Sequence, residues 1–451
     1  MHLFIADSSG TYIHESVFEK YRASYTLKNL KKQNMIRLGN HWSAKKMPDY
    51  IKCYSPSVKK PWYIQVPVGL RSYPSIQFHE EWKFQEVEFP QSSITMHDYQ
   101  EDVVSMLSQA KTWIIKSGAW SWKTIIIIEW IRTLKRKTLI VMKDLTLMKQ
   151  MVRDVQNFLW ITPLQISWKN LSKKVLSECD SRITIVSIES RDKITKEELA
   201  SYGAIFFDEA HTYFSDDRRE WLGSLSPQYL FWLTATPNVN HMENKIFPIY
   251  FWNQIETKWI NIHVPYYYQV YSDFEFYLDD PKDFSVMKEA MYTGEKRNKL
   301  IVDTVVKNIE ERKWLVFCEY ISHAKVIKEM IEAKWIKTYL MVGEVPDTER
   351  ERIQKEVTEY QWRCVIVWSH QIIGTGFNIP ELSFAILTIP IRFDTSVEQF
   401  VGRLSRVHPT KPQAKFYEIT DHLVPMLARQ SQSRVRVYKS TYPTWKVSVA
   451  F

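Results

Sequence analysis

Short runs of β-branched and other apolar residues alternate with amphipathic stretches from about residue 95 to residue 250. Four such runs, each too short for a helix, stand at 138–142, 183–188, 204–207 and 231–233. Runs of this kind, separated by helical patterns, are typical of buried parallel strands in βαβ units. The pattern therefore predicts an α/β domain built on a parallel sheet.

The same alternation resumes after a polar, aromatic and acidic stretch at 271–283. Further strands are predicted at 314–318, 338–341, 364–367 and 385–387, and a helix at 349–359. Two consecutive α/β lobes follow from this repetition. We expect the first lobe at 93–270, an inter-domain region at 271–294, the second lobe at 295–430 and a C-terminal tail at 431–451.

The N-terminal residues 1–92 differ from both lobes because they are basic and rich in aromatic residues. Residues 20–60 hold eleven Lys or Arg and one acid, Asp49. The aromatic residues of this region include Tyr21, Tyr25, Tyr54, Trp62 and Tyr63. A small basic α+β module of this composition suits a polyanion, which it would bind through phosphate contacts and base stacking. A solvated basic face is an equally open alternative.

Length and charge agree with this organisation. The chain has 451 residues, 45% of them hydrophobic, and a formal net charge of +9, which allows about three domains with cores of their own. Cys53, Cys179, Cys318 and Cys364 are scattered, without the spacing of zinc ligands. Because neither a signal peptide nor an apolar run of ~18 residues occurs, we expect a soluble, intracellular protein without membrane contact.

The segment SGAWSWKT stands where a phosphate loop belongs, between an apolar stretch that ends at Ile115 and the run 125–128. A phosphate loop presents backbone N–H groups and a Lys to phosphate, and a Ser or Thr hydroxyl to Mg²⁺. Lys123 and Thr124 match this pattern. Trp120 and Trp122 do not, because glycines are needed where phosphates approach the backbone closely. Alone, this match is weak.

Downstream motifs strengthen the match. The apolar strand at 204–207 leads into Asp208 and Glu209, a pair suited to holding Mg²⁺ and activating water. The next strand ends in LTATP at 233–237, and the second lobe contains GTGFNIP at 374–380. Within QFVGRLSR at 399–406, Arg403 and Arg406 lie one helical turn apart. Such arginines can neutralise charge on a transferred phosphoryl group. Alternatively, they could form salt bridges along the surface of the helix without a role in catalysis.

In this order, the five segments resemble motifs I, II, III, V and VI of superfamily 2 helicases over roughly residues 95–425, and VFCEY at 316–320 resembles motif IV. The chain looks most like the phage and bacterial DNA-repair helicases of the UvsW-like and XPB-like group. The resemblance implies two tandem RecA-like lobes, ATP and Mg²⁺ as cofactors, and DNA as the partner. It also implies the cytoplasm of a prokaryotic cell or a phage-infected host.

The resemblance further implies a role for each matching residue. Catalytic roles would fall to Lys123, to Glu209 as the base, and to Arg403 and Arg406 as arginine fingers. Mg²⁺ would be held by Thr124 and Asp208. The implied ATP-binding residues are Tyr99, Gln100, Ser117, Gly118, Ala119, Trp120, Ser121, Trp122, Lys123, Thr124 and Gly376. The residues implied to couple hydrolysis to motion are His211, Thr234, Thr236, Gly374, Thr375 and Gln399.

Nearly all departures from the family pattern are tryptophans at glycine positions, including Trp120, Trp122, Trp232 and Trp368. Trp113, Trp160, Trp314 and Trp335 also stand where the pattern offers an indole no obvious packing partner. The chain has 11 Gly and 18 Trp, and the two together approach the roughly 30 glycines expected at this length. Our hypothesis is that these positions are encoded by UGA codons, which are translated here as tryptophan but which the source organism reads as glycine.

Three functions remain open from the sequence. The first is an ATP-dependent motor acting on DNA. If the motif tryptophans are genuine, the alternative is a catalytically inactive protein that binds nucleic acid, because an indole at position 122 would occlude the phosphate site. A third possibility is an RNA helicase, since DEAH at 208–211 and TATP at 234–237 do not distinguish DNA helicases from RNA helicases well.

Overall fold

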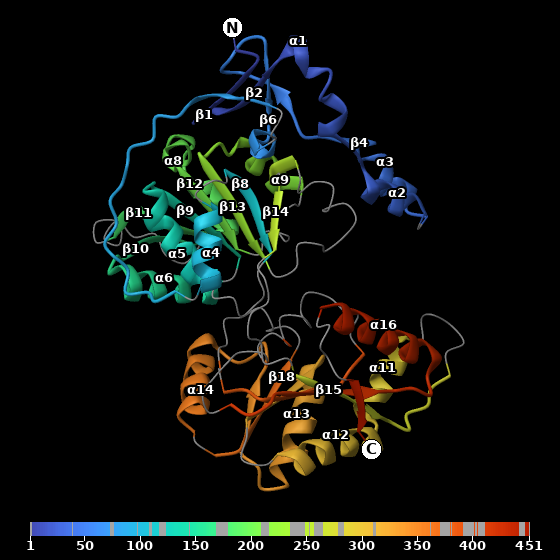
Figure 1. Cartoon of the computed structure of the whole chain (residues 1–451). Coiled ribbons are helices and arrows are strands. Elements are labelled where there is room, and N and C mark those ends of the chain that lie inside the picture. The colour runs from blue at the N-terminus through green and yellow to red at the C-terminus, as the bar shows by residue number, and fades with distance from the viewer. Residues whose placement is uncertain are drawn as a thin grey trace. The chain divides into compact units, whose positions relative to one another are not determined.

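The chain forms two compact units in the computed structural model. The first unit is Met1–Lys258 and the second is Trp259–Phe451 (Figure 1). The structure describes residues 2–37, 39–72, 76–96, 98–107, 111–116, 123–143, 145–167, 179–208, 216–234, 249–251, 253–256, 265–277, 284–309, 313–360, 362–369, 379, 381–390, 401, 404, 411–441 and 447–450.

The first unit begins with a mixed sheet in the order β5-β6-β2-β1-β7. Its strands are β1 (Phe4–Asp7), β2 (Gly10–His14), β5 (Ser55–Pro56), β6 (Tyr63–Val66) and β7 (His79–Glu81). A separate antiparallel pair consists of β3 (Thr26–Lys28) and β4 (Tyr50–Lys52). The helical segments are α1 (Glu15–Phe18), η1 (Arg22–Tyr25), α2 (Leu30–Arg37), α3 (His41–Lys45) and η2 (Val68–Ser72). The N-terminal residues thus form the α+β module expected from their composition.

The rest of the first unit is a parallel sheet in the order β10-β11-β9-β12-β13-β8-β14. Its strands are β8 (Thr112–Lys116), β9 (Thr138–Met142), β10 (Pro163–Ile166), β11 (Asp180–Ser187), β12 (Ala204–Asp208), β13 (Tyr229–Thr234) and β14 (Asn253–Glu256). The helical segments are α4 (Asp98–Leu107), α5 (Lys123–Leu134), α6 (Leu145–Leu159), η3 (Ile188–Lys193), α8 (Lys196–Ser201) and α9 (Asp216–Ser224).

Both faces of this sheet are buried, because successive strand residues point to opposite sides. On β12, Phe206 packs into a core with residues of α4, α5 and α6. Its neighbours Ile205 and Phe207 pack into a second core, together with Leu222 of α9 and residues of the N-terminal module. In Figure 1, α4 and α5 accordingly cover the face of the sheet opposite to α9. The N-terminal module therefore shares a hydrophobic core with the first lobe.

The second unit contains a parallel sheet in the order β17-β18-β16-β19-β20-β15-β21. Its strands are β15 (Tyr266–Tyr271), β16 (Lys313–Cys318), β17 (Thr338–Met341), β18 (Cys364–Ser369), β19 (Phe384–Leu387), β20 (Lys415–Thr420) and β21 (Val447–Ala450). The helices are α11 (Phe284–Thr293), α12 (Glu295–Asn308), α13 (Ile321–Glu332), α14 (Asp347–Glu359) and α16 (Pro425–Thr441).

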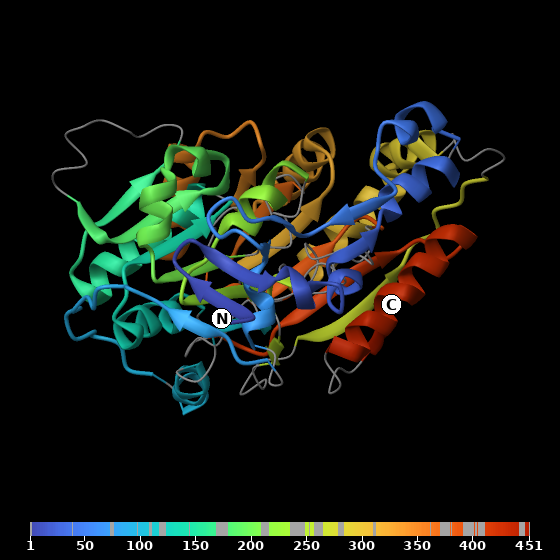
Figure 2. The same ribbon diagram turned by 90° about the horizontal axis from the view of Figure 1, so that it is seen from above.

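Helices α12 and α13 cover one face of this second sheet through apolar residues such as Ile301 and Ile327. On the other face, the ring of Tyr438 in α16 lies 5.1 Å from that of Tyr267 in β15. Figure 2 shows α16 running alongside β15. Two parallel sheets with helices on both faces confirm the predicted α/β class.

The strands predicted from apolar runs are all present, whereas the expected limits of the second lobe need revision. The expected first lobe includes residues 266–270, but β15 pairs within the second sheet. The expected C-terminal tail at 431–451 contains most of α16 and all of β21, and β21 pairs with β15. Both differences arise because β15 and β21, which lie side by side at one end of the second sheet, come from sequence outside its central βα repeats.

Two of the tryptophans expected to lack packing partners have them. Trp314 is fully buried, and its ring centroid lies 4.8 Å from that of Phe384 and 5.5 Å from that of Tyr417. Trp113 packs against the core on the α5 face of the first sheet. The expectation was therefore wrong for these two positions, because both lie within strands whose neighbours supply apolar surface.

Candidate functional site

Several motif residues meet at the carboxyl edge of the first sheet. Strand β12 ends at Asp208 and its neighbour β13 ends at Thr234, with Asp208 opposite Leu233. Thr234 in turn lies opposite Lys116, the last residue of β8. Helix α5 then begins at Lys123. Since the carboxyl ends of neighbouring parallel strands share one edge, Lys123, Asp208 and Thr234 are brought to the same region, where ligands of open α/β sheets bind.

This edge has the chemistry of a phosphate site. The first turn of an α-helix carries N–H groups without intrahelical partners and a partial positive charge, both of which attract anions. The first residue of α5, Lys123, adds a full positive charge there and is partly exposed, as is Thr124. The residues present at the start of α5 therefore fit the phosphates of a nucleotide.

The oxygen donors near this edge also fit Mg²⁺. Thr124 contributes a hydroxyl, and Asp208, which is half-buried, contributes a carboxylate. Within the described ranges, no cluster of three or more His, Cys, Asp and Glu side chains could hold a metal by itself. A hydroxyl and a carboxylate suit Mg²⁺, which usually keeps several waters and binds one or two carboxylates together with substrate phosphates.

Gln100, one of the implied ATP-binding residues, lies on α4 and is fully buried. Helix α4 packs against α5, whose first residue is Lys123. Tyr99 also belongs to α4, while its side chain lies outside the described part of the chain.

The other implied site residues also lie outside the described residues, and their roles remain predictions. They are Ser117, Gly118, Ala119, Trp120, Ser121, Trp122, Glu209, His211, Thr236, Gly374, Thr375, Gly376, Gln399, Arg403 and Arg406.

In the second unit, the segment resembling motif IV leads into a polar cluster that the sequence did not reveal. Glu319, one residue beyond β16, accepts hydrogen bonds from Lys288 Nζ at 2.6 Å and from the Tyr292 hydroxyl at 2.7 Å. Burial and the Glu319 carboxylate both raise the pKa of Tyr292, which therefore remains a hydrogen-bond donor. These contacts hold the end of β16 against α11.

A second polar contact joins α12 to α13. Nε2 of His323 donates to Oδ1 of Asn298 at 3.0 Å, and the Asn298 amide nitrogen donates to the Tyr292 carbonyl at 2.7 Å. Burial, followed by the charge of Arg297, lowers the pKa of His323 to about 3. The imidazole is therefore neutral at physiological pH.

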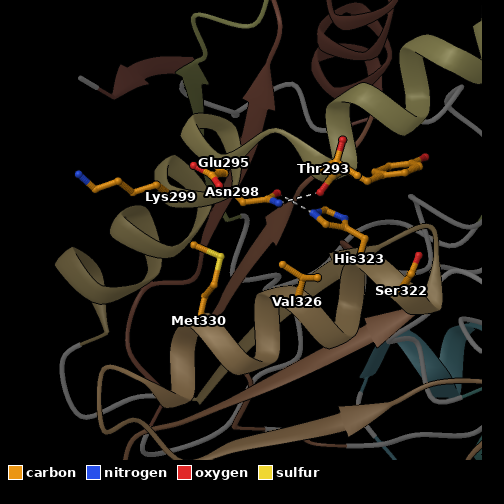
Figure 3. Close-up of a pocket in the computed structure, with 9 residues that line it drawn as sticks. Thr293, Glu295, Asn298, Lys299, Ser322, His323, Val326 and Met330 are labelled. Carbon is orange, nitrogen blue, oxygen red and sulfur yellow. Dashed lines mark hydrogen bonds between the residues drawn. The ribbon is translucent and has the colours of Figure 1, made fainter.

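A pocket of about 620 Å³ opens beside this contact. Figure 3 shows side chains of α12 and α13 facing each other across it. Its lining residues are Tyr292, Thr293, Glu295, Asn298, Lys299, Ser322, His323, Val326 and Met330. This pocket contains none of the implied site residues, so no motif in the chain pointed to it.

The N-terminal module is fastened to the first lobe by buried polar contacts. Arg71 is 5% exposed and donates to the carbonyl oxygens of Pro227 at 2.6 Å and Gln228 at 2.7 Å. The Ser226 hydroxyl donates to the Asp7 carbonyl at 2.7 Å. At Gly69, an added Cβ would lie 2.4 Å from the carbonyl oxygen of Ile249, so the two backbones approach too closely for any larger residue. The module and the lobe thus form one packed body.

The exposed surface of this module is basic around the β3 and β4 pair. Lys28 lies opposite Tyr50 in the ladder, and both side chains are exposed, as are Lys45, Lys46 and Lys52. These four lysines make no ion pair with any described residue. The aromatic residues expected to stack on bases are differently placed, because Tyr25 and Tyr63 are 2% and 8% exposed, whereas Tyr50 is 55% exposed. Because both rings are buried, Tyr25 and Tyr63 are not the aromatic residues of this module that could stack on bases.

No helix in the described ranges is long and apolar enough to cross a membrane.

Comparisons with known proteins agree with the motif order. Residues 93–239 match the family model of the type III restriction enzyme res subunit, and residues 296–408 match that of the helicase conserved C-terminal domain. The protein named "Putative helicase 161L" of Invertebrate iridescent virus 6 is 25% identical over 358 residues, which cover 75% of this chain and 78% of that protein. The ATP-dependent DNA helicase uvsW of Enterobacteria phage T4 is 31% identical over 128 residues, which cover 28% of this chain and 25% of that protein.

A solved structure shows the same fold. S. cerevisiae Dbp5 bound to RNA and ADP BeF3 aligns with a TM-score of 0.56 and 12% identity, covering 78% of this chain and 89% of that chain. The two parallel sheets are thus tandem RecA-like lobes. Because both family models match, in the order in which the motifs occur, the chain belongs to the superfamily 2 helicases and carries their ATPase domains.

Proposed function

We propose that this superfamily 2 protein is an ATP-dependent DNA helicase or translocase that unwinds or remodels duplex or branched DNA. The work would belong to repair, recombination or replication in a prokaryotic cell or a phage-infected host. The observation that carries the proposal is the carboxyl edge of the first sheet, where the start of α5 at Lys123 and the strand ends at Asp208 and Thr234 come together.

At this edge the chain's own residues would act in distinct ways. Lys123 and the first turn of α5 would bind the phosphates of ATP. Thr124 and Asp208 would hold Mg²⁺, which would neutralise charge on the phosphates, and Glu209 would orient and deprotonate water. Thr234, which is fully buried at the end of β13 beside β12, would couple a change at the phosphate to motion.

One observation favours DNA as the polymer, and a second supports the binding of a nucleic acid of either kind. The relative with 31% identity over 128 residues is named as an ATP-dependent DNA helicase. In addition, four exposed lysines and Tyr50 lie on a module that shares a core with the first lobe. Lysines supply sequence-independent contacts to phosphates, and an exposed aromatic ring can stack on a base.

ATP hydrolysis by purified protein tests the motor. We would restore glycine at positions 120 and 122 and measure hydrolysis without nucleic acid, with single-stranded DNA, with branched duplex DNA and with RNA of the same sequence. DNA is expected to raise the rate, and Lys123→Ala is expected to abolish hydrolysis. The matched control is Lys135→Ala, which removes the same charge just beyond the opposite end of α5 and should leave the rate unchanged.

Each outcome separates the alternatives. Equal rates with and without any nucleic acid would reject the motor. Stimulation by RNA but not by DNA would assign the chain to RNA. Salt-sensitive DNA binding without hydrolysis in the protein that keeps Trp120 and Trp122, together with UGG at both codons, would favour the inactive binding protein.

The DNA surface of the N-terminal module has its own test. Binding constants at several salt concentrations would be compared for the parent and for a variant with Lys28, Lys45, Lys46 and Lys52 replaced by Ala. If all four contact phosphates of duplex DNA, the slope of log K against log salt should fall by about 3 to 4. The control replaces Lys325, Lys328, Lys337 and Lys355, each of which pairs with an acid. Equal slopes for parent and module variant would refute this surface.

A further inference from the structure

The backbone conformation of certain tryptophans identifies them as glycine positions. Within the described ranges, four residues other than glycine have a positive φ: Trp62 at 70°, Lys135 at 50°, Trp160 at 53° and Trp335 at 60°. Three of these four are tryptophan, although tryptophan supplies only 18 of the 451 residues. The left-handed region places Cβ too close to the backbone, so it is routinely occupied by glycine and rarely by a bulky residue.

Two of the three follow helices. Helix α6 ends at Leu159, and the Trp160 N–H donates to the Gln156 carbonyl at 2.9 Å. Beyond α13, the Trp335 N–H donates to the Glu332 carbonyl, also at 2.9 Å. A left-handed residue whose N–H returns to a carbonyl of the last turn is the usual way for a helix to end, and that residue is usually glycine.

The third lies in a tight turn. The Tyr63 N–H donates to the Lys60 carbonyl at 3.3 Å, which closes a four-residue turn with Pro61 and Trp62 at its centre. Proline at the second position and a positive φ at the third define a type II turn. The third position of such a turn requires glycine or asparagine.

The indoles themselves do not explain these positions. Trp62 is 70% exposed, Trp160 is 67% exposed and Trp335 is 94% exposed. Trp130, in contrast, is 1% exposed, and its ring centroid lies 4.5 Å from that of Phe231. At the three positive-φ positions, therefore, the backbone is unfavourable for tryptophan and the side chain gains little burial in return.

We infer that positions 62, 160 and 335 are glycine in the protein made by the source organism. We infer further that Trp120 and Trp122 of the phosphate loop also stand for UGA codons that this organism reads as glycine. The first part rests on backbone geometry alone. The extension to the phosphate loop rests on the proposed function, because only an ATP-binding loop needs glycine there. The chemical consequence is a loop that reads SGAGSGKT, in which the backbone can approach phosphate.

The gene gives the first test. UGA at codons 62, 160 and 335, and at 120 and 122, is the expected result. UGG at any of the first three codons would overturn the inference for that position, and UGG at 120 or 122 would overturn its extension to the phosphate loop.

Stability measurements give a second test that needs no knowledge of the gene. Trp160→Gly and Trp160→Ala both remove the indole, but only glycine relieves the left-handed backbone. The glycine variant is expected to have a folded-to-unfolded ratio at least about fivefold higher than the alanine variant. The same comparison at Trp335 should give the same sign, as should Lys135, which has a positive φ but is not tryptophan.

Trp42 is the matched control, because it is 73% exposed but lies within α3. There, alanine should be the more stable replacement, since alanine has a higher helix propensity than glycine. A glycine variant no more stable than the alanine variant at both 160 and 335 would overturn the geometric inference. Absence of ATP hydrolysis in the glycine-restored protein would count against the proposed function and leave these comparisons unaffected.

Discussion

The buried ion pair between Arg297 and Asp421 should make the stability of the second unit sensitive to the loss of either charge alone. Nε and Nη2 of Arg297 donate to the two carboxylate oxygens of Asp421 at 2.8 and 2.9 Å, and the two side chains are 2% and 1% exposed. Nη2 also donates to the Thr388 carbonyl at 2.6 Å, and the Ser272 hydroxyl donates to Asp421. Because Thr388, Asp421 and Ser272 directly follow β19, β20 and β15, the pair ties α12 to the ends of three strands.

Removing one charge leaves the other buried without a counter-charge. Asp421→Asn should therefore lower the free energy of unfolding of this unit by about 3 to 5 kcal/mol, a large part of a typical domain's stability. The double variant Arg297→Met with Asp421→Asn leaves no buried charge. It should lose only about 2 kcal/mol, from the hydrogen bonds that Thr388 and Ser272 no longer share with charged partners.

Native-state hydrogen exchange of peptides from β16, β18 and β19 measures this opening free energy directly. The control is Glu344→Gln, which removes an ion pair with Lys325 whose side chains are 62% and 51% exposed. It should change the opening free energy by no more than about 1 kcal/mol. A loss at Asp421→Asn as small as that of the control, or a double variant as unstable as the sum of the singles, would refute the reasoning.

Three smaller predictions address single contacts. The pKa of His323 is lowered to about 3 from its ordinary 6.5, so between these values the unfolded state binds a proton that the folded state does not. The free energy of unfolding of the second unit should therefore fall as the pH falls below 6.5. In urea titrations, His323→Phe should make this free energy depend less on pH. Arg71→Met should speed proteolysis of the N-terminal module, because the Pro227 and Gln228 carbonyls lose their donor; unchanged cleavage would show that apolar packing alone holds the module. Tyr202→Phe removes a buried hydroxyl that donates to Thr184 at 2.8 Å and should lower the free energy of unfolding by about 1 kcal/mol in denaturant titrations.

The parts of the fold that could be predicted from sequence are those buried on both faces. Strand β9 is predicted to the residue because every position from Thr138 to Met142 is buried, which leaves a continuous apolar run. Strand β14 (Asn253–Glu256) lies at an edge of its sheet and reads NQIE, which has no such run. Edge strands need not be apolar throughout, so hydrophobic pattern alone misses them.

The functional residues also fall into those that local sequence predicts and those that only the folded structure reveals. The positions of Lys123 and Asp208 in the fold could be predicted because Lys123 opens the helix after β8 and Asp208 ends β12, each within a short motif of the local sequence. The pairing of Arg297 with Asp421 joins residues 124 positions apart, and that of Lys288 with Glu319 joins residues 31 apart. Although Glu319 lies within the segment resembling motif IV, its partner Lys288 and the pair of Arg297 with Asp421 lie outside any local motif. Only the packing of α11 and α12 against the strand ends brings the partners together.

Strand β13 connects the N-terminal module, which we propose binds DNA, with the edge of the first sheet, where we propose that ATP is hydrolysed. It begins at Tyr229, directly after the Pro227 and Gln228 carbonyls that Arg71 of the N-terminal module binds, and it ends at Thr234 on the phosphate edge. Its interior residues are fully buried between cores on both faces, one of which includes the module. A packed strand of six residues transmits displacement along its length of about 20 Å more readily than it deforms. Arg71 of the module and the phosphate edge therefore lie at opposite ends of the same buried strand, within one packed body.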